Sequence, residues 1–363
     1  LGDYAITQTE SGRAGKIAVL ALRAQAALYW ASPLFNPDGD KNRYKIAADY
    51  YKELFDECQY QGKGLTAKYA NLWDPNSFNN PEIEKELLFC FRYYSSANGD
   101  HYVEQHNYPV GIEGGTGGTC PTQNLVDAYD MLNGKGINEA GSGYDPKNPY
   151  ANRDPRLAAT VAVNGDVWPS YQTAALQTYQ GGVNGQPLTN ATTTGYYLKK
   201  LCNGALSLAS NGRVTNSFHT YLNFRYGGAL LDYAEAVYQY TGSADATLPG
   251  HTMTARQAVN QVRNRAGMPD ITENGEAFWA KYQKERFVEL SFEGHRFWDV
   301  RRWKEGSKYF SSITRMHIVK NADGSFTYTP QQVSRQWNER NNLFPIPQTE
   351  ITKNGNLKQN TGW

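Results

Sequence analysis

The stretch from Glu285 to Trp303 reads ERFVELSFEGHRFWDVRRW, and it is the most informative part of the sequence. Its large apolar residues recur near the spacing of an α-helix, at Phe287, Leu290, Phe297 and Trp298. Gly294 interrupts the pattern and predicts a kink or break in the helix. A helix this rich in both charges and aromatic rings is expected to lie wedged between other elements, with its rings packed and its charges paired.

The charged residues of this stretch are predicted to be structural. Three glutamates stand four residues apart and share one helix face, and three arginines each lie three residues from an acidic residue, close enough to pair on a helix surface. The predicted pairs are Arg286 with Glu289, Arg296 with Glu293, and Arg302 with Asp299. The structural set is Glu285, Glu289, Glu293, Arg296, Asp299 and Arg302. A catalytic acid–base pair needs two carboxylates whose pKa values are pushed apart across a cleft. A row of glutamates beside arginines is held ionised instead, so we expect no catalytic residue here.

Two motifs give the chain a family resemblance. The stretch 285–303 resembles the C-terminal signature of the SusD/RagB family, the surface glycan-binding lipoproteins of Gram-negative polysaccharide-uptake systems. A second signature closes the chain with LFPIPQTE at 343–350 and NGNLKQN at 354–360. It resembles the family's PIP-x-x-E and N-x-N-L-x-Q-N run. Two such motifs in the expected order are more specific than a single glycine-rich loop.

The overall composition narrows the possible partners. The chain has 363 residues and a net charge of +1. Its net charge is therefore too small to attract nucleic acid or an anionic membrane electrostatically. Tyrosine is the outlier, with 26 Tyr and 8 Trp against 4 Met. Aromatic rings with a polar edge suit carbohydrate binding, although most of these tyrosines are expected to pack between helices.

We expect neither a metal nor a cofactor. The cysteines Cys58, Cys90, Cys120 and Cys202 lie far apart and form no C-x-x-C pair. Cys58 and Cys90 stand in apolar segments and are predicted to be core residues, whereas the sequence leaves open whether any cysteines pair. Residues 38–49 resemble a degraded EF-hand loop, but Arg43 replaces the glycine and Asp49 the bidentate glutamate, so a solvated turn is the expectation.

The expected fold is mainly α. GRAGKIAVLALRAQAALYW at 12–30 predicts a helix, and 44–58 its antiparallel partner. Helices are also predicted at 122–132, 223–240 and 254–266. The resemblance implies tetratricopeptide-like hairpins near 12–58 and 221–303, with long irregular loops and small strands between them. It implies strands near 82–94 and 159–163, and family-like segments at NRDPRL (152–157) and GYYLKK (195–200). A single domain over 1–363 is expected, with the C-terminal signature at 343–363.

Aromatic residues on polar loops are the candidate glycan contacts. Loops rich in Asn, Gly and Asp leave backbone groups that need water, so their rings cannot all be core. The candidates lie in a loop-rich region near 62–200, and they are Trp73, Tyr102, Tyr108, Trp168 and Tyr171. Each ring, taken alone, could equally be an anchor that pins its loop.

The resemblance implies a non-catalytic protein that binds a glycan at the outer membrane and delivers it to a SusC-like TonB-dependent transporter. The alternatives are a helical scaffold that binds proteins and a glycoside hydrolase. The start of this chain, from Leu1, resembles the middle of a SusD-like protein. In the family, a signal, a lipidated cysteine and a first helical section come before that region. We therefore expect a membrane link only through a lipid anchor that this chain does not contain.

Overall fold

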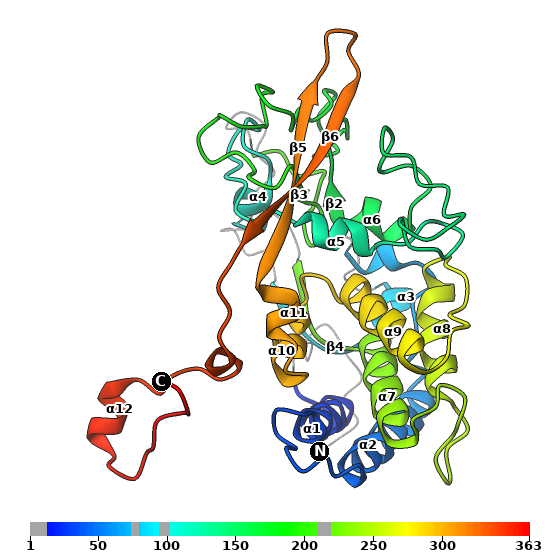
Figure 1. Ribbon diagram of the computed structural model, residues 1–363. Helices are drawn as coiled ribbons and strands as arrows, with labels where there is room; N and C mark the ends of the chain where they lie inside the picture. The colour runs from blue at the N-terminus through cyan, green and yellow to red at the C-terminus, as the bar shows by residue number, and fades with distance from the viewer. Residues whose placement is uncertain (1–12, 74–79, 94–101, 209–218) are drawn as a thin grey trace.

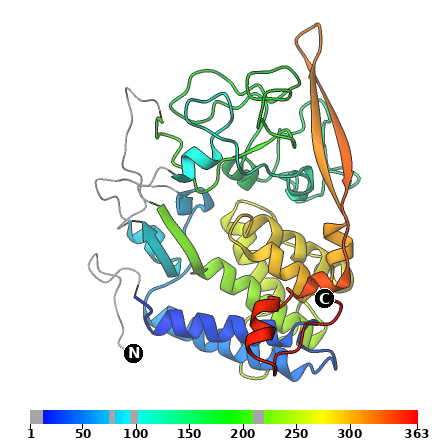
Figure 2. The same cartoon turned by 90° about the vertical axis from the view of Figure 1, so that its left-hand side faces the viewer.

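The structure, a computed structural model, describes residues 13–73, 80–93, 102–208 and 219–363. The protein is mainly helical, as predicted. Helices occupy one half of the molecule, and irregular segments with short helices and strands occupy the other (Figures 1 and 2). The largest apolar cluster lies among the long helices.

The first two helices form the predicted antiparallel hairpin. They are α1, Lys16–Ala31, and α2, Asn42–Tyr60. Alanines at the contact, among them Ala24, Ala47 and Ala48, are fully buried and let the helices approach closely. Asp49, the twelfth residue of the EF-hand-like segment, accepts hydrogen bonds from Lys45 Nζ (2.8 Å) and His251 Nε2 (2.9 Å).

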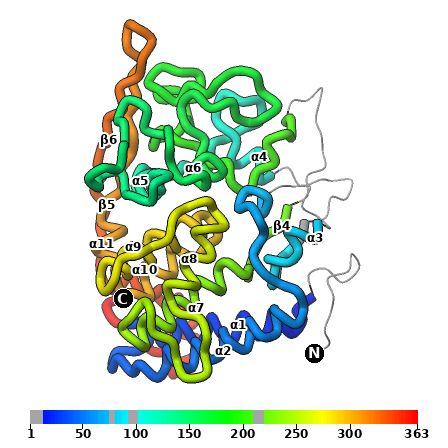
Figure 3. Tube along the Cα trace, turned by 90° about the vertical axis from the view of Figure 1, so that its right-hand side faces the viewer, coloured from blue at the N-terminus to red at the C-terminus, as the bar shows by residue number. Residues whose placement is uncertain are grey.

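The second group of helices completes this half of the molecule. It contains α7 (Tyr226–Thr241), α8 (Ala255–Arg265), α9 (Gly275–Glu289), α10 (His295–Arg302) and α11 (Gly306–Phe310). Helix α7 lies against both α2 and α8 (Figure 3) and is buried around most of its circumference. Helix α8 begins with a capping box of Thr254 and Gln257. The predicted break falls at Gly294, whose φ of 84° favours glycine.

One helix prediction and one strand prediction need correction at their boundaries. The predicted helix 223–240 begins only at Tyr226, because β4 (His219–Arg225) precedes it and pairs antiparallel with β1 (Leu87–Tyr93). The predicted strand 159–163 shrinks to β2, Val161–Ala162, which pairs with β3, Tyr197–Leu198. The first residues of the predicted strand belong instead to helix α6, Pro155–Thr160. This helix begins here because Pro155 suits its first turn and the Asp154 side chain caps it by accepting a hydrogen bond from Arg156 N.

A long β-hairpin was not predicted. Strands β5, Ser312–Lys320, and β6, Phe326–Ser334, pair through a turn containing Gly324, whose φ is 87°. The hairpin runs along the loop-rich half and projects beyond it (Figure 1). Met316 pairs with Pro330, and Met316 N donates to Thr194 O (2.9 Å), outside the hairpin. Met316 and Pro330 are therefore not joined by a backbone hydrogen bond. A residue at position 330 would not donate its N–H to β5, so the missing N–H of the proline costs no β5–β6 hydrogen bond.

The remaining elements are short. They are η1 (Tyr69–Trp73), α3 (Pro81–Glu84), α4 (Tyr102–Asn107), α5 (Gln123–Ala128), η3 (Glu339–Asn342) and α12 (Gln348–Lys353). The two parts of the closing signature bind one another: Gln359 bonds both the N–H (2.8 Å) and the C=O (2.9 Å) of Ile346, and Asn360 Nδ2 donates to Phe344 O. None of the four cysteines, all of which the structure describes, forms a disulfide, and Cys58 and Cys90 are buried in the core as predicted.

Candidate functional site

Three of the five predicted aromatic residues meet in one cluster in the loop-rich half. The ring of Tyr108 lies 6.1 Å from Trp168 in an edge contact and 6.2 Å from Tyr171. Tyr108 itself is fully buried, and its hydroxyl donates to Asn203 O (2.5 Å) and Leu206 O (3.0 Å). Tyr108 therefore offers no ring face to a ligand, which is the anchor alternative left open for each ring. It anchors the two loops that carry its neighbours.

Trp168 and Tyr171 are partly exposed at the edge of this cluster. The backbone of residues 203–206 supports both of them. Tyr171 N donates to Gly204 O (3.3 Å), and a Cβ on Gly204 would lie 2.2 Å from the Trp168 ring. Only glycine at position 204 allows the indole to lie this close to the chain. The loop therefore holds Trp168 in a defined position.

Tyr102 begins α4 and is 70% exposed. Its neighbour Val103 packs against the same aromatic cluster, so Tyr102 stands at the rim of that cluster. The fully buried Glu104 fixes the helix by accepting hydrogen bonds from Asn203 N (2.6 Å) and His219 Nε2 (2.8 Å). We name Tyr102, Trp168 and Tyr171 the rim aromatics.

Trp73 lies apart from the rim aromatics. Its ring makes an edge contact with Tyr69 (5.8 Å) and covers Lys200 Nζ at 4.2 Å. Lys200 donates to Ser291 O (2.6 Å) and Glu293 Oε1 (2.8 Å). Burial lowers the pKa of Lys200 to about 8. Trp73 thus covers a buried ammonium group on the side of the helical half.

The three signature glutamates lie at the centre of a buried ion network. Glu289 accepts hydrogen bonds from Arg156 (2.8 Å), Arg225 (2.7 Å) and Arg265. Burial alone would raise the pKa of Glu289, but the three arginines outweigh it and lower that pKa. Glu285 pairs with Arg156 and with Arg263 (2.8 Å).

Glu293 follows α9 in the turn before α10. Its two oxygens accept from Arg225 Nε (2.7 Å) and Lys200 Nζ (2.8 Å). Burial acts to raise the pKa of Glu293, yet the neighbouring positive charges hold it at about 2. None of the three glutamates is positioned as a proton donor at neutral pH.

Two of the three predicted pairs are wrong. Arg286 pairs with Asp232 and with Asp299 (2.7 Å) rather than with Glu289. Arg296 stacks on the rings of Phe287 (4.4 Å) and Tyr309 (4.0 Å), while Glu293 has other partners. The predicted pair of Arg302 with Asp299 is confirmed at 2.9 Å. The buried arginines find partners on distant segments because burial, unlike a solvated helix surface, requires their charges to be compensated fully.

The missed partners come from the other family-like segments. Gly227 makes room for two of these partners, Arg225 and Glu86. A Cβ at position 227 would lie 2.6 Å from Arg225 Nη1 and 2.9 Å from Glu86 Oε1. Charged residues inside apolar runs were the available signal: Asp232 and Glu235 lie in a nearly all-apolar helix. The partners that the sequence did not reveal include Glu86, Arg156, Lys200, Arg225, Asp232, Glu235, Arg263 and Arg265.

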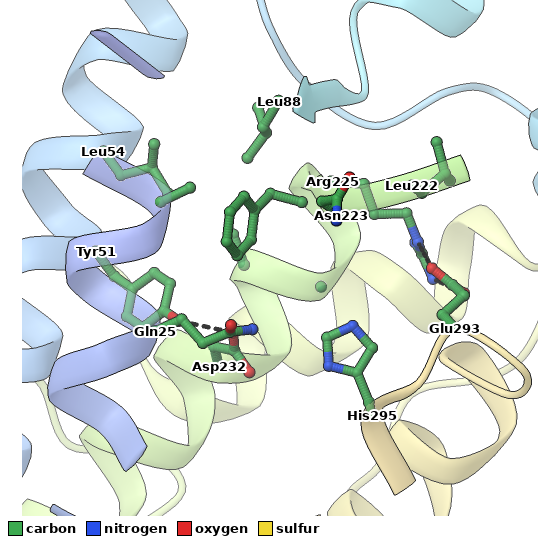
Figure 4. A pocket seen from close by; sticks show the side chains of 14 residues that line it. Gln25, Tyr51, Leu54, Leu88, Leu222, Asn223, Arg225, Asp232, Glu293 and His295 are labelled. Atoms are coloured by element: carbon green, nitrogen blue, oxygen red, sulfur yellow. Dashed lines mark hydrogen bonds and ion pairs between the residues drawn. The ribbon is translucent and has the colours of Figure 1, made fainter. Parts of the chain in front are cut away.

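A small pocket borders this network between α1, α2, α7 and the start of α10 (Figure 4). Its polar lining includes Gln25, Asp232 and His295, and the Tyr51 hydroxyl donates to Asp232 Oδ2 (2.6 Å). The cavity volume of about 20 Å³ suffices for one water molecule and not for a sugar. This pocket is part of the helical core and not a ligand site.

In the described part of the chain, no group of three or more His, Cys, Asp and Glu side chains is placed to hold a metal ion. Among the same residues, no helix has the length and apolar character needed to cross a bilayer.

Comparison with known proteins then gives the family. A model of the SusD family matches residues 85–363. The chain belongs to the SusD family. No curated protein sequence matches it. A solved SusD-like protein from Bacteroides fragilis NCTC 9343 is 27% identical, with a TM-score of 0.78 over 99% of this chain and 67% of that one.

Two other solved structures share the SusD fold at lower identity. A SusD-like carbohydrate binding protein from Bacteroides fragilis NCTC 9343 is 23% identical, with a TM-score of 0.72, over 98% of this chain and 67% of that chain. The surface glycan-binding protein A of Bacteroides uniformis is 18% identical, with a TM-score of 0.57, over 98% and 63%. The chain thus spans about two thirds of the length of the SusD-like structures that it matches.

Proposed function

We propose that this protein binds a polysaccharide or oligosaccharide at the outer membrane without cleaving it. Membership of a family that includes a protein described as carbohydrate binding supports the ligand class. The observation that carries the proposal is the set of rim aromatics beside one anchored cluster: Tyr102 is exposed, and Trp168 and Tyr171 are partly exposed. Rings in this position can stack on the C–H faces of sugar units.

The proposed site lies in the loop-rich region 62–200. Tyr102, Trp168 and Tyr171 supply the rings, and Tyr108 supports them from beneath. Gln105 and Gln172 stand close in sequence to these rings and offer amide groups for sugar hydroxyls. Trp73 has no place in this site, because its ring covers Lys200.

The proposed role is binding and not hydrolysis. A glycosidase needs one carboxyl group protonated and another ionised on either side of the bond that is cleaved. The signature glutamates do not meet this requirement, since their arginine partners keep them ionised.

The family membership suggests further steps that we include in the proposal. The bound glycan is passed to a SusC-like TonB-dependent transporter, and a lipid anchor outside this chain holds the protein at the cell surface. The alternative of a scaffold that binds only proteins gives no reason for exposed rings on polar loops. Co-elution of the purified protein with a SusC-like transporter from the same cell tests the delivery step.

Affinity electrophoresis tests the binding step. The purified protein is run in native gels that contain individual polysaccharides, and retention relative to a blank gel is measured. Tyr102→Ala, Trp168→Ala and Tyr171→Ala are each expected to weaken retention without changing the unfolding temperature. Tyr60→Ala is the matched control, because Tyr60 is 78% exposed at the end of α2 in the helical half. Normal retention of all three rim variants would place the site elsewhere.

A further inference from the structure

A second cavity lies beside the middle of the long hairpin, between β5 and the loop 178–195. Its volume is about 320 Å³, within the ~300–1,000 Å³ of small-ligand sites. Its polar side chains come from both walls and include Gln180, Gln186, Thr193, Arg315, His317 and Gln331. The rim aromatics do not line it, so it is distinct from their cluster.

The two walls are joined by backbone hydrogen bonds on either side of His317. Met316 N donates to Thr194 O (2.9 Å), and Gln180 N donates to Ile318 O (2.8 Å). Gly195 has a φ of 88°, and a Cβ there would lie 2.7 Å from Met316 O. Only glycine allows the loop to approach the strand this closely. The loop is therefore held against β5, and the two walls of the cavity are fixed relative to one another.

The lining of this cavity contains basic side chains and no acidic ones among the described residues. In the part of the chain that the structure describes, no carboxylate lines it, although Arg315 and His317 do. Arg315 donates through Nε to Gln331 Oε1 (3.0 Å), and its guanidinium takes part in none of the ion pairs formed by described residues. The buried arginines of the signature network differ, since their guanidinium groups are compensated by carboxylates.

We propose that this cavity binds an acidic sugar unit of the glycan, carrying either a carboxylate or a sulfate group. This inference rests on the proposed function and adds a charge class to the ligand. An arginine fork recognises the planar carboxylate or the sulfate oxygens through two parallel N–H donors. The amides of Gln180, Gln186 and Gln331 and the hydroxyl of Thr193 then serve the neutral hydroxyl groups of the same unit.

Pairs of polysaccharides that differ only in charge give the test. Polygalacturonate is compared with its methyl ester, and dextran sulfate with dextran, by affinity electrophoresis of the intact chain. The first pair reports a carboxylate and the second a sulfate group. The protein is expected to bind the acidic member of at least one pair more tightly than the neutral member, and added NaCl is expected to weaken this binding.

Two variants that each lose one positive charge test whether the preference for acidic polysaccharides arises at this cavity. Arg315→Gln is expected to lower affinity for the acidic polysaccharide about tenfold, the size expected for a lost charged hydrogen bond. Arg335→Gln is the control, because Arg335 is exposed just beyond the end of β6 and does not line the cavity. Arg315→Lys keeps the charge without the fork and is expected to fall between them. Unfolding temperatures check that each variant is folded.

The outcomes separate the two proposals. Equal binding of acidic and neutral members, or equal effects of Arg315→Gln and Arg335→Gln, overturns the acidic-sugar inference. If the protein then still binds neutral polysaccharides through the rim aromatics, the proposed function stands. Binding of no polysaccharide at all contradicts both.

Discussion

Glu289 is the residue on which the buried network depends most. It is fully buried and accepts hydrogen bonds from three arginines that come from three different segments. Removing one member of a buried pair leaves the opposite charge uncompensated, whereas an exposed pair is worth little. Single changes in this network are therefore expected to act on folding and not on ligand binding.

Glu289→Gln is expected to lower the free energy of unfolding by about 3–5 kcal/mol, because three buried arginines lose their shared negative charge. Arg296→Ala is the comparison within the same signature. Arg296 makes ring contacts and no carboxylate pair in the described chain, so a loss of about 1 kcal/mol is expected. Urea unfolding measures both. Equal losses for the two variants would contradict this ranking.

The pH dependence of stability follows from Glu293. Its pKa is about 2 in the folded protein, below its usual value of 4.5. A depressed carboxyl pKa stabilises the fold fully above about pH 4.5, and this stabilisation is lost as the pH falls toward 2. We expect Glu293→Gln to be less stable than the wild type at pH 7 and to lose less stability on acidification. Urea midpoints between pH 7 and pH 3 test this, and parallel curves would contradict it.

At the residue scale, the sequence pointed to the charged residues of the signature stretch but not to the partners that they meet. The spacing of three and four residues describes neighbours on a helix surface, and it found Arg302 with Asp299. Arg286 reaches Asp232 on α7 instead, a contact that only the tertiary packing creates. The same limit applies to Tyr108, because a loop position in the sequence does not reveal that the ring is fully buried.

Among the elements, the segment 203–206 connects the rim aromatics to their support. Gly204→Ala is expected to push the Trp168 ring out of position, since the new Cβ would lie 2.2 Å from it. Weaker glycan retention and a shift in tryptophan fluorescence should follow. Gly64→Ala is the control, because a Cβ there meets no atom within 4 Å. Unchanged fluorescence and retention in Gly204→Ala would show that this support is unimportant.

The long helices were predictable, whereas the β5–β6 hairpin and α6 were not. The apolar spacing of α1, α2 and α8 extends over several turns, so the periodicity was clear. The β5–β6 hairpin went unpredicted because β6 is mostly exposed, and the buried residues of β5, Met316 and Ile318, form too short an alternation to mark a strand. Helix α6, which Asp154 caps, extends to Thr160 and so into the segment where the family resemblance had implied a strand.

At the scale of the whole molecule, the helical half supports a loop-rich half that carries the proposed sites. The buried network spans the boundary, because Arg156 at the start of α6 binds Glu285 and Glu289 on α9. The rim aromatics and the cavity beside β5 both lie on the loop-rich half. Binding at either site is thus expected to raise the unfolding temperature of the entire chain.

The most direct test of the account is a titration of the intact protein with an oligosaccharide cut from a polysaccharide that retains it. Calorimetry measures the binding, and chromatography of the same sample measures the chain length of the sugar afterwards. The account predicts saturable binding, a loss of affinity in the rim variants, and recovery of the oligosaccharide unshortened. Shortened products would make the protein an enzyme, and the absence of saturable binding to any glycan would contradict the proposed function.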